Sequence, residues 1–282
     1  MKKILVPIDF SLPSRWAADV ACDVAKRSGA EIVLLNVVEQ STQQSFSVQG
    51  HVSDLEGWEE KLFTLKLIEK NKEELNSWTN DFHCTEVKVT QMLRIGNPFH
   101  GIHTVITDQA VDLVVMGTLG HSFLENIFLG STTDKVVRYS KCPVLTVHEK
   151  PSSKVYENIV YATSMSEDEN AFARVLCTAQ ELYGATVHFV KINTPSSFTP
   201  DNQTKKLLMD FASKLGFSKY TVNVFNDLTA EEGIIHFADS IGADLIGMAT
   251  HGRSAFAQVL GRSIAEDVVN HSKQPVLTYV TK

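Results

Sequence analysis

The sequence predicts an α/β protein made of two repeated, doubly wound domains, each with a mostly parallel five-stranded sheet and helices on both faces. Three observations predict this class. The chain has 282 residues, of which 43% are hydrophobic, and this is enough apolar material for two cores. Short apolar runs alternate with helical patterns, which is typical of a parallel sheet. An internal repeat also places the same order of elements in each half.

The internal repeat consists of four pairs of segments that recur in the same order. The pairs are residues 3–11 and 158–166, 29–33 and 184–188, 111–117 and 243–249, and 142–146 and 274–278. The offset falls from 155 at Asp9 and Ser164 to 132 at Pro143 and Pro275, so the first copy carries about 23 extra residues. We expect this surplus in residues 39–58, which are rich in Gln and Ser and are typical of a long surface loop.

The boundary between the copies is expected near residues 148–156, where Pro151 and two serines supply a linker. This division predicts one domain over residues 1–150 and a second, shortened domain over residues 151–282.

The first elements follow from local sequence signals. The β-branched apolar run from Ile4 to Ile8 predicts a strand that is covered on both faces. Ser11 can cap a following helix that has Pro13 in its first turn and ends at Gly29. Apolar residues recur along that helix at helical spacing, and residues 32–38 then predict a second strand.

The rest of each copy alternates in the same way. The further elements expected in the first copy are a helix over 60–78, a strand over 87–93, a helix opened by Asn97-Pro98, a strand over 113–116, a helix over 132–138 and a strand over 144–148. The second copy repeats this order, including a capping box at Thr229 and Glu232 before its penultimate helix.

Charge and hydropathy argue against several classes of protein. Acidic residues outnumber basic ones by 33 to 26, and this net charge of -7 argues against a nucleic-acid binder. No apolar run approaches the roughly 18 residues that a membrane span requires. The apolar stretch after Lys2 and Lys3 is broken by Pro7 before a signal-peptide core forms. We therefore expect a cytoplasmic protein with no membrane span and no nucleic-acid partner.

Cysteine and histidine spacing offers no metal site. The four cysteines lie far apart and form no C-x-x-C pair: Cys22, Cys84, Cys142 and Cys177. We expect buried or idle thiols. His100 and His103 share one face of an expected helix, but no carboxylate or thiol joins them at ligand spacing, so a solvated helix face is the interpretation.

Two strand ends carry the candidate site, because ligands of open parallel sheets bind beyond the carboxyl ends of the strands. The first strand ends at Asp9, whose carboxylate would accept hydrogen bonds from ribose or adenine. The strand over 113–116 runs into Gly117 and Gly120, and nine residues later Gly130 opens a helix. Such glycines approach an anion closely and adopt positive φ, while helix amides and hydroxyls supply donors. Taken one by one, the same features also fit helix caps and turns.

The combination resembles the universal stress protein family, in which an Asp closing the first strand accompanies the pattern G-x2-G-x9-G-[ST]. Residues 1–148 match this pattern without a gap. The opening Val6-Pro7-Ile8-Asp9-Phe10-Ser11 and Pro143-Val144-Leu145 in the last strand also look like the family. The chain departs from it mainly at Asn36, where His is common.

The resemblance implies an ATP site. Asp9 would lie at the ribose and adenine. The base and nucleoside would be surrounded by Pro7, Ile8, Val37, Met116 and Gly117. The phosphates would be held by Gly120, Gly130, Ser131, Thr132 and Thr133. Mg2+ would sit on the phosphates themselves, so no metal-ligating residues are expected in the protein.

The second copy has the same family pattern with an altered site. Ser164 replaces Asp9, Lys191 replaces Asn36, Ala249 replaces Gly117 and Arg262 replaces Gly130; of the motif, Gly252 and Ser263 stay in register. An arginine side chain at that position would occupy space that the phosphates need. We expect one working site and one structural partner.

The leading functional prediction is an ATP-binding regulator of the stress response whose nucleotide state alters an interaction with an unknown protein partner. One alternative is a slow ATPase or phosphoryl-transfer enzyme, although neither a Walker-type loop nor a kinase catalytic segment is present. The other is a nucleotide-independent adaptor that binds another small or lipid-like ligand in the second copy. No catalytic residue is assigned.

The family resemblance also implies how the copies assemble. Single domains of the family commonly pair through their last strands, and residues 276–280 repeat the apolar pattern of residues 144–147. We expect the two copies to pair within one chain in this way, covering both strand edges. A homodimer of chains is a further possibility.

Overall fold

The computed structural model describes residues 1–39, 54–118, 130–151, 155–251 and 263–281. The elements of the first half are β1 (Lys3–Pro7), α1 (Leu12–Ser28), β2 (Glu31–Val38), α2 (Asp54–Asn80), β3 (Val89–Ile95), α3 (Pro98–Asp108), β4 (Leu113–Gly117), α4 (Ser131–Tyr139) and β5 (Val144–Val147). Those of the second half are β6 (Asn158–Ala162), the short 3-10 helix η1 (Glu167–Glu169), α5 (Asn170–Tyr183), β7 (Thr186–Asn193), α6 (Asp201–Ser213), β8 (Tyr220–Asn226), α7 (Ala230–Ser240), β9 (Leu245–His251), α8 (Ile264–His271) and β10 (Val276–Thr281).

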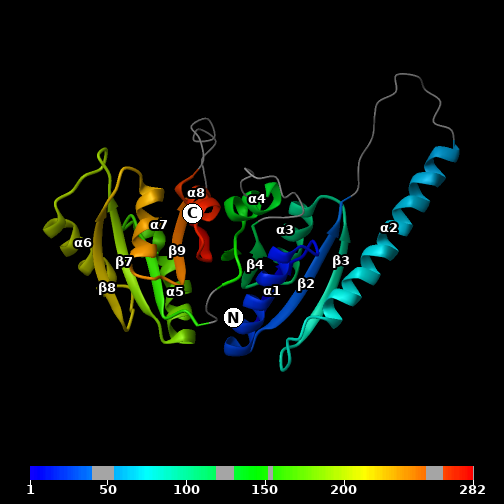
Figure 1. The fold of residues 1–282 in the computed structure, drawn as a ribbon, viewed down its shortest axis with the longest axis horizontal. Coiled ribbons are helices and arrows are strands. Elements are labelled where there is room, and N and C mark those ends of the chain that lie inside the picture. Colours follow the sequence, from blue (N-terminus) through cyan, green and yellow to red (C-terminus); the bar gives the residue numbers. More distant parts are fainter. Residues whose placement is uncertain (40–53, 119–129, 152–154, 252–262, 282) are drawn as a thin grey trace, which may run out of the picture.

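The strands form a single ten-stranded sheet in the order β3-β2-β1-β4-β5-β10-β9-β6-β7-β8 (Figure 1). Neighbouring strands are parallel except where β5 meets β10, and there the pairing is antiparallel. The expected α/β class, with a mostly parallel five-stranded sheet in each repeat, is confirmed. Among the described residues, no helix combines the length and apolar character of a membrane span.

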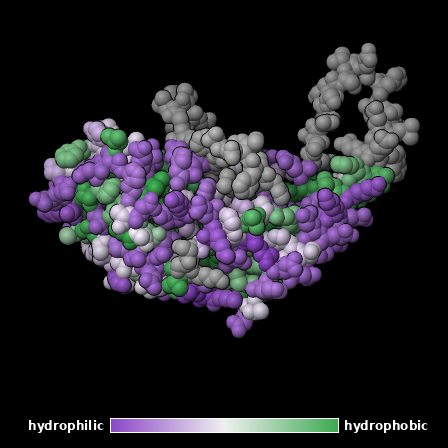
Figure 2. Space-filling model, in the orientation of Figure 1, coloured by the Kyte–Doolittle hydropathy of each residue, from purple (hydrophilic) through white to green (hydrophobic). Residues whose placement is uncertain are grey.

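Helices cover both faces of this sheet. One face packs against α1, α2, α5 and α6, and its apolar core runs without interruption from Ile4 in the first half to Leu277 in the second. The opposite face has a separate core in each half, built on α3 and α4 in the first and on α7 and α8 in the second. Because the apolar strand residues are covered on both sides, hydrophilic residues dominate the described surface in the space-filling view (Figure 2).

The last strands of the two halves join the sheet into one. Leu277 of β10 lies opposite Leu145 of β5 in antiparallel register. The hydroxyl of Thr146 donates to the Val276 carbonyl at 3.1 Å, and that of Thr278 donates to the Val144 carbonyl at 3.4 Å. The pairing expected within one chain is therefore present, and it covers one edge of each half.

Helix ends follow the sequence signals. The Ser11 hydroxyl accepts a hydrogen bond from the Ser14 amide at the start of α1, where Pro13 occupies the first turn. Gly29 ends that helix with φ at 72°, a left-handed conformation that glycine adopts without steric cost. Asn97 caps α3, as expected. Thr229 caps α7 by accepting from the Glu232 amide, but the Glu232 carboxylate accepts from the Thr229 hydroxyl and not from its amide, so only half of the expected capping box forms.

The extra residues of the first half do not form a loop alone. The sequence predicts the surplus in residues 39–58 and a helix that begins near residue 60, but α2 begins at Asp54. This helix has 27 residues, whereas α6 at the equivalent position has 13. More than half of the surplus is therefore helical, and the loop assignment was too long. Residues 40–53 lie outside the described residues.

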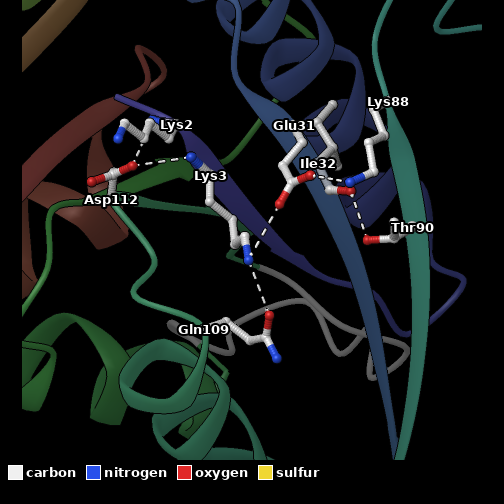
Figure 3. A network of polar contacts seen from close by, with 8 residues as sticks. All are labelled: Lys2, Lys3, Glu31, Ile32, Lys88, Thr90, Gln109 and Asp112. Atoms are coloured by element: carbon white, nitrogen blue, oxygen red, sulfur yellow. Dashed lines mark hydrogen bonds and ion pairs between the residues drawn. The ribbon is translucent and has the colours of Figure 1, made fainter.

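A network of polar contacts fixes the amino ends of the first strands (Figure 3). The Asp112 carboxylate accepts hydrogen bonds from the backbone amides of Lys2 at 2.6 Å and Lys3 at 3.0 Å. Asp244, its counterpart in the repeat, accepts from the amides of Glu157 and Asn158, both at 2.9 Å. Asp112 and Asp244 thus anchor the strand that opens each half.

The same network continues across the neighbouring strands. The Glu31 carboxylate binds the ammonium groups of Lys88 at 2.7 Å and Lys3 at 3.2 Å (Figure 3). These two cations lower the pKa of the Glu31 carboxyl. Exposed ion pairs of this kind contribute little to stability, so the network mainly fixes the register of β1, β2 and β3.

The expectation that all four cysteines are free thiols is wrong. Cys22 on α1 and Cys84, which lies between α2 and β3, form a disulfide with their Cα atoms 5.8 Å apart. The two residues are 62 positions apart, and local spacing cannot show a pairing that the packing of α1 against the end of α2 creates. Cys142, buried, and Cys177, half-buried, are free.

Removal of this disulfide should lower the free energy of unfolding. A cross-link that closes a loop of 62 residues typically stabilises by about 2–4 kcal/mol, chiefly because it restricts the unfolded chain. In urea unfolding without reductant, we expect the free energy of unfolding of Cys22→Ser to be lower by about this amount. With reductant, the variant and the unmodified chain should have the same free energy of unfolding.

The matched control is Cys177→Ser, because Cys177 occupies the same position in the second half without a disulfide. Cys177→Ser should lower the free energy of unfolding by less than Cys22→Ser does. Equal unfolding free energies for Cys22→Ser and the unmodified chain under oxidising conditions would contradict the cross-link.

Candidate functional site

A cavity of about 370 Å³ opens at the carboxyl ends of β1, β2 and β4. Its lining includes all but one of the residues expected at the site: Pro7, Ile8, Asp9, Val37, Met116, Gly117, Gly130, Ser131, Thr132 and Thr133. The exception, Gly120, lies outside the described residues. The fold therefore brings residues from four separate segments of the chain to one place.

Asp9 is positioned by the turn that follows β1. Phe10 adopts a left-handed conformation with φ at 65°, which turns the chain sharply between the strand and α1. One oxygen of the Asp9 carboxylate accepts hydrogen bonds from the Ser11 amide at 3.1 Å and the Ser11 hydroxyl at 2.5 Å. These contacts hold the carboxylate at the cavity wall, and they also link it to the residue that caps α1.

The start of α4 supplies amide donors to the cavity. Its N-cap residue is Gly130, so no side chain caps the first turn. The amides of that turn have no partners within the helix, and the helix dipole favours an anion there. Thr133 is held in place because its hydroxyl donates to the Gly117 carbonyl at 3.1 Å.

Gly117 and Gly130, the two described glycines of the loop motif, are explained by the room that a Cβ atom would occupy and not by positive φ. The expectation of positive φ is wrong here, since Gly130 has φ at -56° and Gly117 is not among the residues of positive φ. A Cβ on Gly117 would lie 2.7 Å from the backbone carbon of Pro13. A Cβ on Gly130 would meet only the Thr118 carbonyl oxygen, at 3.5 Å. Gly117 thus permits close packing of β4 against α1, whereas Gly130 keeps the cavity open.

Thr118 fixes the base of the loop that follows β4. Its amide donates to the Val147 carbonyl at 3.2 Å, and its carbonyl accepts from the Gly130 amide at 3.0 Å. Its hydroxyl lies 2.9 Å from Nδ1 of His148. Burial lowers the pKa of His148, which favours the neutral ring.

Asn36 lines the cavity from β2 and is almost completely buried. Its side-chain nitrogen donates to the Ile8 carbonyl at 2.9 Å. Its side-chain oxygen is buried and has no hydrogen-bond partner among the described residues. The sequence marked Asn36 only as a departure from a family pattern and gave no sign of this unpaired acceptor.

Other lining residues were missed because they come from elements that the motif does not include. Pro98 and Ile102 reach the cavity from α3, and Ser14 and Glu39 complete its wall. The apolar spacing of α3 shows that Ile102 faces the sheet. Only the strand order shows that the part of the sheet it faces lies beside the cavity.

The second half has a smaller cavity at the equivalent place, of about 290 Å³. Met165 repeats the left-handed turn of Phe10, with φ at 64°, so the backbone is similar. Ser164 stands where Asp9 does in the first half, and the nearest carboxylate comes from Glu169. That carboxylate is buried and accepts hydrogen bonds from four neighbouring residues: Tyr161, Thr163, Ser164 and Ser166. It is therefore engaged within the protein itself.

The anion-binding features of the second cavity also differ. The Ser263 hydroxyl caps α8 by accepting from the Glu266 amide at 3.2 Å, whereas α4 has no such cap. Lys191 and Ala249 line the cavity where Asn36 and Gly117 line the first one. Arg262 and Gly252 lie outside the described residues.

A doubly wound sheet with a cavity at the carboxyl ends of its central strands defines a class of α/β ligand-binding proteins. The sequence profile of the Universal stress protein family matches residues 1–148 and 227–279. The chain belongs to this family.

The chain is also similar to individual universal stress proteins. The chain is 31% identical over 158 residues to the universal stress protein MJ0577 of Methanocaldococcus jannaschii, an alignment that covers 54% of this chain and 97% of that protein. A solved universal stress protein from Archaeoglobus fulgidus has the same fold across both halves, with a TM-score of 0.76, 19% identity and coverage of 99% of this chain and 96% of that one. A universal stress protein solved in complex with cAMP aligns with 45% of this chain and 99% of its own, at 19% identity and a TM-score of 0.39.

The packing argument for Gly117 predicts a stability effect. Gly117→Ala places a Cβ 2.7 Å from the backbone of Pro13, and overpacking of this kind typically costs about 1–3 kcal/mol. We expect a lower midpoint of thermal unfolding for this variant. Gly130→Ala is the matched control and should leave the midpoint unchanged, because its Cβ has room. Equal midpoints for the two variants would refute the packing role of Gly117.

Proposed function

We propose that this chain is an ATP-binding stress-response protein that acts as a nucleotide-held regulator, with one intact site in its N-terminal half. The observation that carries the proposal is the cavity that gathers Asp9, an apolar wall and the uncapped start of α4. The domains are residues 1–150 and 151–282. We infer a cytoplasmic protein that acts on an unknown protein partner and is able to form a homodimer.

The cavity suits the three parts of a nucleoside triphosphate. Ile8, Val37, Ile102 and Met116 supply apolar surface for a base. Asp9 supplies a carboxylate for ribose hydroxyls, and the amides at the start of α4 supply donors for phosphates. This layout supports ATP as the ligand.

Mg2+ fits the site only together with the phosphates. Among the described residues, no cluster of three or more His, Cys, Asp or Glu side chains is arranged to hold a metal ion. The described lining also holds Asp9 and Glu39 but no Lys or Arg. A divalent cation bound to the phosphate oxygens would offset the repulsion between the triphosphate and these carboxylates.

The second half supports a structural role rather than a second ATP site. Ser164 replaces Asp9, Lys191 replaces Asn36, and the Ser263 side chain caps the helix that would face the phosphates. Each change removes a feature on which the first site depends.

A second candidate function is an adaptor that binds another small ligand in the second cavity. The observation in its favour is the Thr250 hydroxyl, which is buried, lines that cavity and has no partner among the described residues. Native mass spectrometry of the purified protein separates the candidates by showing whether ATP or another molecule is retained.

ATP binding should have a stoichiometry of one per chain. Asp9→Ala should weaken binding by about tenfold or more, since hydrogen bonds to a charged group contribute about 1.5–3 kcal/mol. Gly130→Leu should abolish binding, because its side chain would fill the space beside the amides of α4 while the backbone conformation remains allowed. Isothermal titration calorimetry measures both effects.

Ser164→Ala is the matched control in the second half and should leave ATP affinity unchanged. A stoichiometry of two would contradict the inactive second site. ATP binding at full strength by a folded Gly130→Leu variant would refute the role of α4.

Bound ATP should turn over slowly or not at all. Amides and hydroxyls that hold the ground state and the transition state equally well do not accelerate the chemical step. The cation that stabilises charge on the γ-phosphate contributes roughly 10³ to 10⁵ in rate, and the sequence has no Lys or Arg over residues 119–129 to supply one.

Single-turnover assays with Mg2+ measure this rate. Turnover faster than about one per second, within the ordinary range for enzymes, would favour the alternative of an ATPase or phosphoryl-transfer enzyme if Asp9→Ala abolished it. Slower turnover that is insensitive to Asp9→Ala supports the regulator.

A further inference from the structure

We propose that the groove between α5 and α6 in the second half binds an arginine-like ligand, whose guanidinium takes the place that the Arg15 side chain fills in the first half. The groove has a volume of about 880 Å³. It lies on the face of the sheet that α5 and α6 cover, whereas the second cavity lies against α7 and α8 on the opposite face. A ligand in this groove is therefore separate from any nucleotide in the proposed ATP site.

The first half shows which chemical group occupies the equivalent place between α1 and α2. There the central carbon of the Arg15 guanidinium lies 4.9 Å from the centre of the Trp78 ring and 5.4 Å from that of the Phe82 ring. The guanidinium also donates to the backbone carbonyls of Trp78, at 3.3 Å, and of Asp81. These carbonyls lie at the end of α2, where the last carbonyls of a helix lack partners within it and attract cations. Arg15 thus stacks on two rings and caps a helix.

The second half has a short, uncharged side chain at the position of Arg15. Gly29 and Gly184 end α1 and α5 at an offset of 155 residues. The same offset aligns Arg15 with Asn170. Asn170 is exposed and lines the groove. Its side chain is too short to span the groove as an arginine does, so the space beside it is available to a ligand.

The surfaces that hold Arg15 have counterparts in the second half. Because α2 ends at Asn80 and α6 at Ser213, the two helices align at an offset of 133 residues. Phe211 and Leu215 then take the places of the two rings that hold Arg15. Both are half-buried and line the groove. The groove therefore offers a planar cation an aromatic ring, an apolar side chain and the carboxyl end of a helix.

The charged residues of the groove indicate a second group on the ligand. Glu167 and Asp210 supply carboxylates, whereas Arg174 and Lys214 supply cations. A ligand that carries only a positive charge is attracted by the first pair and repelled by the second. A ligand with both a guanidinium and a carboxylate interacts favourably with both pairs. Free arginine and a peptide that ends in arginine each carry these two groups.

The test is a titration of the unmodified chain followed by NMR of labelled leucine methyl groups, because Leu215 lines the groove. L-Arginine should bind at least about fivefold more tightly than L-citrulline, which has a similar shape but a neutral urea group. A peptide that ends in arginine distinguishes the two sources: binding tighter than that of free arginine indicates a protein partner, and weaker binding indicates a small molecule. Equal affinity for arginine and citrulline, or no binding of either, would overturn the proposal.

Agmatine tests the role of the two cations, because it keeps the guanidinium and lacks the carboxylate. It should bind more weakly than arginine, since Arg174 and Lys214 then have no group to pair with. Agmatine binding as tightly as arginine would overturn the assignment of a carboxylate to the ligand.

Asn170→Arg should close the site, because the new side chain would fill the groove as Arg15 does in the first half. We expect this variant to lose arginine binding while its midpoint of thermal unfolding stays the same or rises. Gln203→Arg is the matched control: it adds the same cation to exposed surface of α6 outside the groove lining, and it should leave arginine binding unchanged. Arginine binding at full strength by a folded Asn170→Arg variant, or equal losses in both variants, would overturn the proposal.

Discussion

The antiparallel pairing of β5 with β10 is the interaction on which the rest of the molecule depends. Each half presents its last strand as an edge, and an unpaired edge is a template for aggregation. Pairing the two edges creates one sheet and lets a single apolar core run beneath both halves. Arg138 of α4 adds an ion pair with the buried Glu266 of α8, at 2.7 Å. Removal of Arg138 alone would leave that carboxylate buried without its cation, which is strongly destabilising.

Within this shared sheet, the two halves keep a similar backbone geometry but differ in the chemistry of their cavities. Phe10 and Met165 adopt the same left-handed turn, and Asp112 and Asp244 anchor the opening strand of each half in the same way. These features fix the path of the chain and do not involve the side chains that line the cavities. The side chains at the carboxyl ends of the strands bear only on what the cavity can hold, and there Asp9 has become Ser164. The structure thus separates residues that make the fold from residues that make the site.

Much of this arrangement could be predicted from the sequence, because strands, helix caps and repeats leave local signals. Ser11, Asn97 and Gly29 mark helix ends, and the end of β1 places Asp9 at the switch point of the sheet. Side-chain pairing across long separations leaves no such signal. The Cys22–Cys84 disulfide depends on how α1 packs, and the unpaired oxygen of Asn36 becomes visible only once the Ile8 carbonyl lies beside it.

Glu169 illustrates a different limit. The repeat aligns it with Ser14, so comparison of the two halves shows a new carboxylate but not its role. Its role follows from the loss of Asp9 at Ser164, since the donors around the turn still require an acceptor. Glu169 meets that requirement from the start of the helical segment that follows, with Thr163 at 2.6 Å and the Ser164 hydroxyl at 2.6 Å.

Helix α4 connects the candidate site to the second half. Its first residues line the cavity of the candidate site, and Arg138 in its last turn pairs with Glu266 on α8, whose own first residues line the second cavity. A ligand shifts a conformational equilibrium only through contacts that differ between the two states. The amides of the first turn of α4 have no partners within the helix, so an anion bound there would make contacts of this kind. A regulator built on this fold would therefore be able to couple an anion at the start of α4 to the second half through the Arg138–Glu266 ion pair.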